Sequence, residues 1–191
     1  MTRLFVAAVL TLVAGFAHAI PIVYVASLSG PNESPPVPSP GTGFARVTFD
    51  DIAHTMRVEA TFEDLVGLTT VAHIHCCTAT PGDLTAGVAT TTPTFPGFPA
   101  GVTAGTYDQL FDLTLASSWN SAFITANGGT IALAEAALAA GLAEGRAYLN
   151  VHTSFAPGGE IRGFLRVPEP GTLALLGLAL GALALRRRAI H

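Results

Sequence analysis

The chain has 191 residues, of which half are hydrophobic and only 12% are charged, so it holds enough apolar material for one domain with a core. It contains no lysine, and residues 20–167 hold five arginines against twelve acidic side chains, a net charge of −7. This balance excludes a basic surface for nucleic acid.

Residues 1–19 have the pattern of a secretory signal peptide. Arg3 gives a positive start, an apolar run follows, and Ala17-His18-Ala19 fits the small-x-small cleavage pattern. We expect cleavage after Ala19, which places the remaining chain in an oxidising compartment outside the cytoplasm.

Residues 20–167 are expected to form a single domain made mainly of antiparallel strands. In residues 55–63 apolar side chains alternate with polar ones, which predicts a strand with one buried face. Similar signals predict strands at 22–28, 44–49, 70–76, 107–113, 148–153 and 160–167. Helices are expected at 117–126, capped by Ser117 or Ser118, and at 130–143, ended by Gly145. The predicted fold is a Greek-key-like β-sandwich with one or two short helical inserts.

Three histidines are the strongest candidates for chemistry. His73 and His75 are two residues apart on a predicted strand, so their side chains point to the same face. Tyr148, Asn150 and His152 share one face of another predicted strand. If these two strands are neighbours, the three imidazoles converge, and zinc or copper is then the expected ion. The alternative is a hydrogen-bonded network that only joins the two strands.

Cys76 and Cys77 are the two cysteines of the chain and directly follow the histidine strand. Three states are open to them: a disulfide between adjacent residues, ligation of a metal together with the histidines, or free thiols. The expected oxidising compartment and the lack of another cysteine favour the disulfide.

The chain shows no nucleophile motif, no phosphate-binding glycine loop and no His-Glu-x-x-His sequence, so no catalytic residue is predicted. Glu160 and Arg162 share one face of the last predicted strand, where a surface ion pair is expected. An enzyme is therefore the less expected interpretation.

The C-terminal segment, residues 168–191, begins with Pro168-Glu169-Pro170, continues with an apolar stretch at 172–185 and ends near Arg186-Arg187-Arg188. It resembles the PEP-CTERM sorting signal of Gram-negative bacteria. The resemblance implies a transmembrane helix that anchors the precursor, cleavage by an exosortase-type membrane protease, and release or transfer of the domain to the cell surface. Exopolysaccharide or a surface protein is then the expected partner.

Four blocks lie between residues 24 and 167. They contain Leu28-Ser29-Gly30 with Glu33 and Pro35-Pro36-Val37, then Ala72-His73-Ile74-His75, then the run from Gly145 to Thr153, and finally the run from Pro157 to Gly163. In this order the four blocks resemble the chordin-type (CHRD) domain. The resemblance implies an extracellular β-sandwich module and assigns it no activity.

His73-Ile74-His75 is also distantly similar to the His-x-His strand of copper/zinc superoxide dismutases. Those enzymes need further histidines, a metal-binding loop and a catalytic arginine, so their activity is not carried over. Two hypotheses follow. One is a non-enzymatic exported binding or structural module, and the other is a metal-binding or redox protein centred on His73, His75 and His152.

Overall fold

The computed structural model describes residues 20–169. The expected signal peptide at 1–19 lies outside the described residues, and so do the apolar stretch at 172–185 and the three arginines that follow it. Within residues 20–169, no helix is long and apolar enough to cross a membrane.

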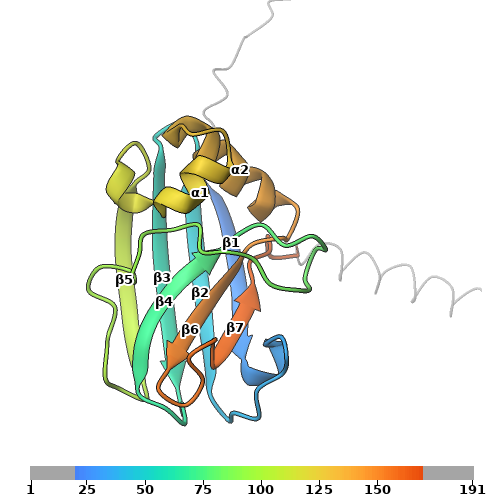
Figure 1. Cartoon of the computed structure of the whole chain (residues 1–191), viewed down its shortest axis with the longest axis vertical. Coiled ribbons are helices and arrows are strands. Elements are labelled where there is room, and N and C mark those ends of the chain that lie inside the picture. The colour runs from blue at the N-terminus through green and yellow to red at the C-terminus, as the bar shows by residue number, and fades with distance from the viewer. Residues whose placement is uncertain (1–19, 170–191) are drawn as a thin grey trace, which may run out of the picture.

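Seven strands form one antiparallel sheet (Figure 1). In sheet order they run β4-β6-β7-β1-β2-β3-β5. Their bounds are β1 Ile22–Ser29, β2 Thr42–Asp50, β3 Thr55–Glu63, β4 Thr69–His75, β5 Gly105–Asp112, β6 Tyr148–Thr153 and β7 Ile161–Phe164. The predicted mainly β, antiparallel fold is confirmed, and each predicted strand is found with shifts of one or two residues at most ends. The last strand is shorter than the predicted 160–167.

The alternation in residues 55–63 determines which side chains of β3 face the core. Met56, Val58, Ala60 and Phe62 are buried, while the residues between them face outward. β3 pairs with β2 along its whole length and with β5 on its other side. Such a strand is stable only with one face against a core, which the rest of the sheet supplies.

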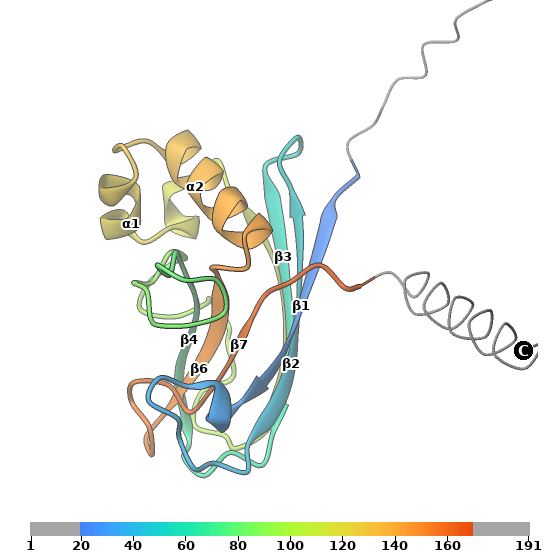
Figure 2. The ribbon, with the colours of Figure 1, turned by 90° about the vertical axis from the view of Figure 1, so that its right-hand side faces the viewer.

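The sheet curls so that β4, β6 and β7 face the half made by β1, β2 and β3 (Figure 2). The two halves stay continuous through a short contact between β1 and β7, where Ser29 pairs with Arg162 and Val25 with Arg166. The core lies between them and is filled by inward side chains from both, including Val47, Met56, Ile74, Leu149 and Ile161.

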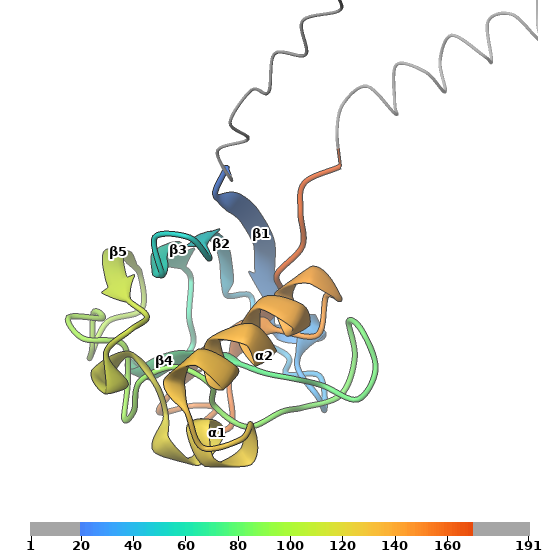
Figure 3. The same ribbon diagram turned by 90° about the horizontal axis from the view of Figure 1, so that it is seen from above.

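The helices sit at one end of the sheet (Figures 1 and 3). They are α1, Ser121–Ala126, and α2, Ile131–Ala143, and short 3-10 turns occur at Gly30–Asn32 and Ala116–Ser118. The predicted second helix is confirmed: the Thr130 side chain caps its start, and Gly145 follows its end with a φ of +66°. The predicted cap of the first helix is wrong, because Ser118 belongs to a 3-10 turn and Asn120 caps α1 instead.

The segment between β4 and β5 runs along the free edge of β4. Its backbone pairs with the strand at several points, among them Ala89 N–H with Ile74 C=O and Phe95 N–H with Ala72 C=O. Phe95 and Phe98 are buried in the core. The segment therefore covers the edge and fixes the position of its own carbonyl groups next to β4.

One glycine of α2 shows how closely this helix packs on the end of β4. A Cβ built on Gly141 would lie closer than van der Waals contact to both Cys76 Sγ and Cys77 Sγ. We expect Gly141→Ala to lower the free energy of unfolding by about 1–2 kcal/mol, because overpacking outweighs the gain in helix propensity. Unfolding in urea measures this loss in the free energy of unfolding. Gly87→Ala is the matched control, since nothing lies within 4 Å of its added Cβ. Equal midpoints for the two variants would contradict the prediction.

Candidate metal centre

Strands β4, β6 and β7 carry a row of polar side chains on the face turned away from the core. The histidine strand β4 pairs with the Tyr148 strand β6, which is the condition on which convergence of the three rings depended. His73 lies opposite Asn150, which lies opposite Arg162, and His75 lies opposite Tyr148. Residues directly opposite one another in antiparallel strands share a face. The sheet thus builds a continuous polar patch from segments about 75 residues apart in the chain.

The structure brings His73, His75 and His152 together. One ring nitrogen from each lies within 4.8 Å of those from the other two. The ring centroids of His73 and His152 are 5.4 Å apart, and those of His75 and His152 are 5.7 Å apart. All three side chains are buried, with exposed fractions of 5–8%. The fourth histidine of the described residues, His54, lies in an exposed turn and pairs with Glu135 instead.

Each imidazole is held by one backbone carbonyl. His73 Nε2 donates to Pro93 O at 2.5 Å, His75 Nδ1 to Ala86 O at 2.9 Å, and His152 Nδ1 to Pro157 O at 2.9 Å. These bonds fix the tautomers, because the donating nitrogen must carry the proton.

The second nitrogen of each ring has no hydrogen-bond partner among the described residues. These atoms are His73 Nδ1, His75 Nε2 and His152 Nε2, and all three are buried. A buried polar atom without a partner costs free energy, so three of them in one cluster need an explanation. A ring that donates one N–H to a carbonyl and keeps the other nitrogen free is the usual arrangement of a metal-binding histidine.

Burial keeps the three rings neutral. It is the main cause that lowers the pKa of His73 and of His152, and it lowers the pKa of His75 to about 4. Mutual repulsion adds to this effect, since a charge on His152 also lowers the pKa of both other rings. Neutral imidazoles have the free lone pairs that a zinc or copper ion binds.

Aromatic and charged neighbours hold the cluster on one side. The Tyr148 ring stacks on His75 with centroids 4.9 Å apart, and the Arg162 guanidinium lies 4.8 Å from the centre of the Tyr148 ring. Arg162 is buried and lies 3.7 Å from the Glu33 carboxylate. Burial raises the pKa of Glu33 to about 7, against the opposing effect of Arg162.

The predicted surface ion pair between Glu160 and Arg162 is wrong. Both side chains are buried, and Arg162 pairs with Glu33 rather than with Glu160. Glu160 instead accepts hydrogen bonds from Ser39 and Thr153 and from two backbone N–H groups. The alternation correctly predicted the face of the strand on which Arg162 lies. Segments from elsewhere in the chain nevertheless cover Glu160 and Arg162, which the pattern predicted to be exposed.

Cys76 and Cys77 are joined as a disulfide in the structure. Their sulfur atoms pack against Gly141 of α2, and the group of possible ligands contains the three histidines without either cysteine. The pair lies next to a hollow of about 430 Å³ that is also lined by residues of α1, among them Phe123 and Ala126.

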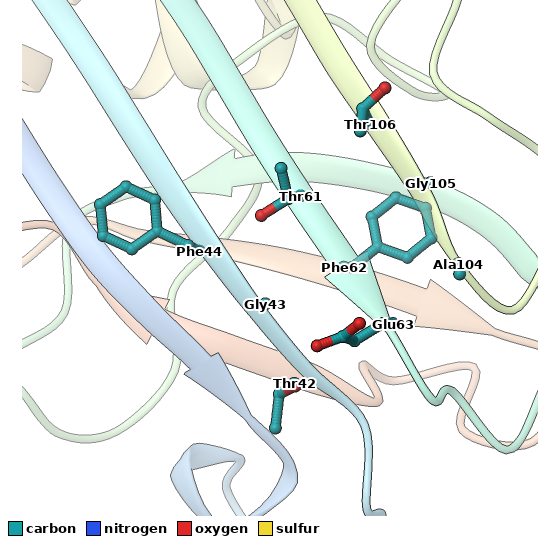
Figure 4. A pocket seen from close by; sticks show the side chains of 9 residues that line it. All are labelled: Thr42, Gly43, Phe44, Thr61, Phe62, Glu63, Ala104, Gly105 and Thr106. Carbon is teal, nitrogen blue, oxygen red and sulfur yellow. The ribbon is translucent and has the colours of Figure 1, made fainter.

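A hollow elsewhere on the molecule lacks such chemistry. It has a volume of about 640 Å³ and lies on β2, β3 and β5, where Phe44, Thr61 and Thr106 surround it (Figure 4). Glu63 is the one titratable side chain in its lining. The histidine centre, not this hollow, is therefore the candidate functional site.

Sequence reasoning named the three histidines but missed Glu33 as part of the polar patch. Its only signal was its place in the first block of the CHRD resemblance. The carbonyl groups of Ala86, Pro93 and Pro157 could not be predicted from the sequence, because every residue has a backbone oxygen and its position depends on the fold.

Comparison with known proteins gives two family matches. Residues 24–165 match the model described as CHRD domain, and residues 166–188 match the PEP-CTERM protein-sorting motif. Among curated proteins and among solved structures, nothing matches the chain.

Proposed function

The chain belongs to the CHRD domain family and is made as an exported, membrane-anchored precursor with a signal for an exosortase-type enzyme, and we propose that its mature domain is a non-enzymatic metal-binding module. The metal ligands in this proposal are His73, His75 and His152. Zinc or copper is the ion, and the cell surface of a Gram-negative bacterium is the final location. The comparisons do not favour the superoxide-dismutase-like alternative, and we propose no redox activity.

The observation that carries the metal proposal is the set of three buried, partnerless imidazole nitrogens in one cluster. A hydrogen-bonded network would use both nitrogens of each ring, because its purpose is to satisfy buried polar atoms. Here the carbonyl groups satisfy only one nitrogen of each. Three nitrogen ligands with one open position are a common zinc arrangement.

The fit to a metal ion needs a small contraction. Ligands about 2.0–2.1 Å from a tetrahedral zinc lie roughly 3.4 Å apart, and one ring nitrogen from each histidine lies within 4.8 Å of those from the other two. The proposal therefore requires the rings to move closer together when the ion binds. The neutral state of the rings favours the same step, since no proton has to be displaced.

Metal analysis of the purified full chain tests the proposal. We expect about one zinc or copper ion per chain after loading and desalting. The double variant His73→Ala/His75→Ala and the single variant His152→Ala are expected to hold less than about a tenth of that amount, since each removes ligands that the protein cannot replace.

His54→Ala is the matched control, because His54 is exposed and lies outside the cluster. It is expected to keep the full metal content. Metal-free wild-type protein with a normal circular dichroism spectrum would contradict the proposal and leave the structural network as the role of the three histidines.

For the sorting signal, we expect the substitution of Pro168, Glu169 and Pro170 by alanine to leave the precursor uncleaved in a host that has the exosortase. Immunoblots of membrane and extracellular fractions show the outcome. Normal release of the substituted protein would mean that processing does not depend on this segment.

A further inference from the structure

The disulfide between Cys76 and Cys77 joins no distant parts of the chain. The two residues are adjacent, so the bond encloses no intervening residue. In the loop-closure model a disulfide stabilises a fold by constraining the unfolded chain, and this contribution falls as the closed loop becomes shorter. Within residues 20–169, the group of possible metal ligands contains neither sulfur atom. The chemistry of the sulfur atoms themselves is then the alternative to a structural role.

The two cysteines differ in their access to solvent. Cys76 belongs to the core and has an exposed fraction of 5%, whereas Cys77 is half-buried and packs against the core. The hollow of about 430 Å³ beside α1 lies against the pair, and its volume is in the range that holds small molecules. An attacking thiol must reach a sulfur of the disulfide before the two can exchange. Cys77 is therefore the residue that a thiol in this hollow reaches first.

Arg146 is the one charged residue in the lining of this hollow. Its side chain remains 33% exposed. Its Nε donates to Thr78 O, and one of its terminal nitrogens donates to the Glu144 carboxylate at 2.9 Å, so the guanidinium is held beside the disulfide. Glu144 compensates part of the charge but does not line the hollow. Because the thiolate is the form of a thiol that attacks a disulfide, a cation at this place favours the approach.

The surroundings of Cys76 suit it as the group that leaves. Cys76 lies in the hydrophobic core, where a protonated cysteine behaves as a small apolar side chain. Gly141 of α2 leaves room for both sulfur atoms, since a Cβ at this position would overlap them. Cys76 also lines the hollow, which gives its sulfur access to a proton from water. A released Cys76 can therefore stay in the core as a neutral thiol.

We infer that Cys77 is a covalent attachment site for a small thiol such as cysteine or glutathione. The thiol loses its proton to water, its thiolate attacks Cys77 Sγ, and a new S–S bond forms as the Cys76–Cys77 bond breaks. Cys76 leaves with the electron pair of the broken bond and takes up a proton from water. One disulfide replaces another, so the exchange needs no oxidant and no reductant. The inference does not depend on the metal site, since no histidine lines the hollow.

The rate at which dithiothreitol opens the disulfide of the full-length wild type gives the first test. Dithiothreitol makes the same first attack and, as a dithiol, drives it to completion. Acid quenching followed by alkylation and intact mass measures the rate. We expect the rate to change less than about twofold between zero and about 1 M urea, because the folded protein is attacked. A route through unfolding would raise the rate about tenfold or more over this interval, which would overturn the inference.

Two single-cysteine variants show which sulfur is open. Cys76→Ser keeps Cys77, and Cys77→Ser keeps Cys76. With glutathione disulfide as the probe, we expect the folded Cys76→Ser variant to gain one glutathione per chain at least about ten times faster than the folded Cys77→Ser variant. Both variants should react at the same rate in concentrated urea, where burial no longer separates them. This comparison is the matched control.

Each outcome decides for or against the attachment site. Equal rates in the folded variants, or a faster reaction at Cys76, overturn it. A purified wild type whose two thiols are both free before any thiol is added also overturns it. If circular dichroism shows that a variant does not fold, the urea dependence of the wild type decides alone.

Discussion

Addition of Zn²⁺ to the metal-free protein is expected to raise its melting temperature by about 5–11 °C. At a free ion concentration one hundred times the dissociation constant, binding to the folded state alone adds about 2.7 kcal/mol to its stability. For a domain of this size, each kcal/mol corresponds to about 2–4 °C. The ligands come from β4 and β6 and exist as a cluster only in the folded state. Differential scanning calorimetry with and without the ion measures the shift.

The variants distinguish a metal site from a structural network. In His152→Ala the melting temperature is expected to be the same with and without Zn²⁺, while His54→Ala should keep the full shift. If the three rings serve only as a network, the His152 substitution lowers stability in both conditions alike, and the wild type gains nothing from the ion. A wild-type shift below 1 °C in saturating Zn²⁺ would reject the metal site.

Glu160→Ala is expected to destabilise the domain by about 3–5 kcal/mol. The carboxylate is fully buried and accepts four hydrogen bonds, at 2.6 Å from Ser39 Oγ, 2.5 Å from Thr153 Oγ1, 2.6 Å from Val66 N–H and 3.1 Å from Gly67 N–H. Its removal leaves the Gly67 N–H and the Thr153 hydroxyl buried without this acceptor and the two part-buried donors unpaired as well, which costs more than the loss of an exposed charge. The carboxylate joins the start of β7 to two loops and to the end of β6. Chemical unfolding in urea gives the value.

Glu63→Gln is the matched control, because Glu63 is an exposed residue at the end of β3. Its free energy of unfolding should change by less than about 0.5 kcal/mol. A loss below 1 kcal/mol in Glu160→Ala would show that solvent satisfies the four donors, and the structural role given to Glu160 would be wrong.

The same carboxylate makes stability depend on pH. Burial by itself raises the pKa of Glu160, but its hydrogen bonds with Ser39, Thr153, Val66 and Gly67 together bring it below the usual value of 4.5. The folded state therefore binds the proton less readily than the unfolded state. The stabilising contribution is present above pH 4.5 and is lost as the pH falls through the lowered pKa. Glu160→Gln should remove this part of the acid sensitivity, which melting curves between pH 3 and pH 7 can show.

Local patterns predicted the strands because each pattern is a property of neighbouring residues. The alternation around Val58 and Ala60 states which side chains face the core, and the spacing of His73 and His75 states that both point to one face. Gly145 likewise ends its helix through its own backbone freedom.

Patterns of this kind failed where burial depends on segments far away in the chain. Glu160 and Arg162 look like surface residues because both are charged, yet Ser39 and Glu33 from the segment after β1 cover them. The cap of α1 was misplaced for a similar reason, since Ala116–Ser118 forms a 3-10 turn, and the side chains of Ser118 and Trp119 donate hydrogen bonds back to Asp112 O and Leu113 O.

Short runs of residues were enough to predict the antiparallel strands, the family, the sorting signal and the three histidines, because each of these is a local feature of the chain. That β4 and β6 are neighbours, that the three rings meet, and that carbonyl groups of Ala86, Pro93 and Pro157 leave one nitrogen of each ring free became known from the fold alone. A ring nitrogen stays free only where no neighbouring group bonds to it, and the neighbours here are backbone atoms whose positions depend on the whole fold.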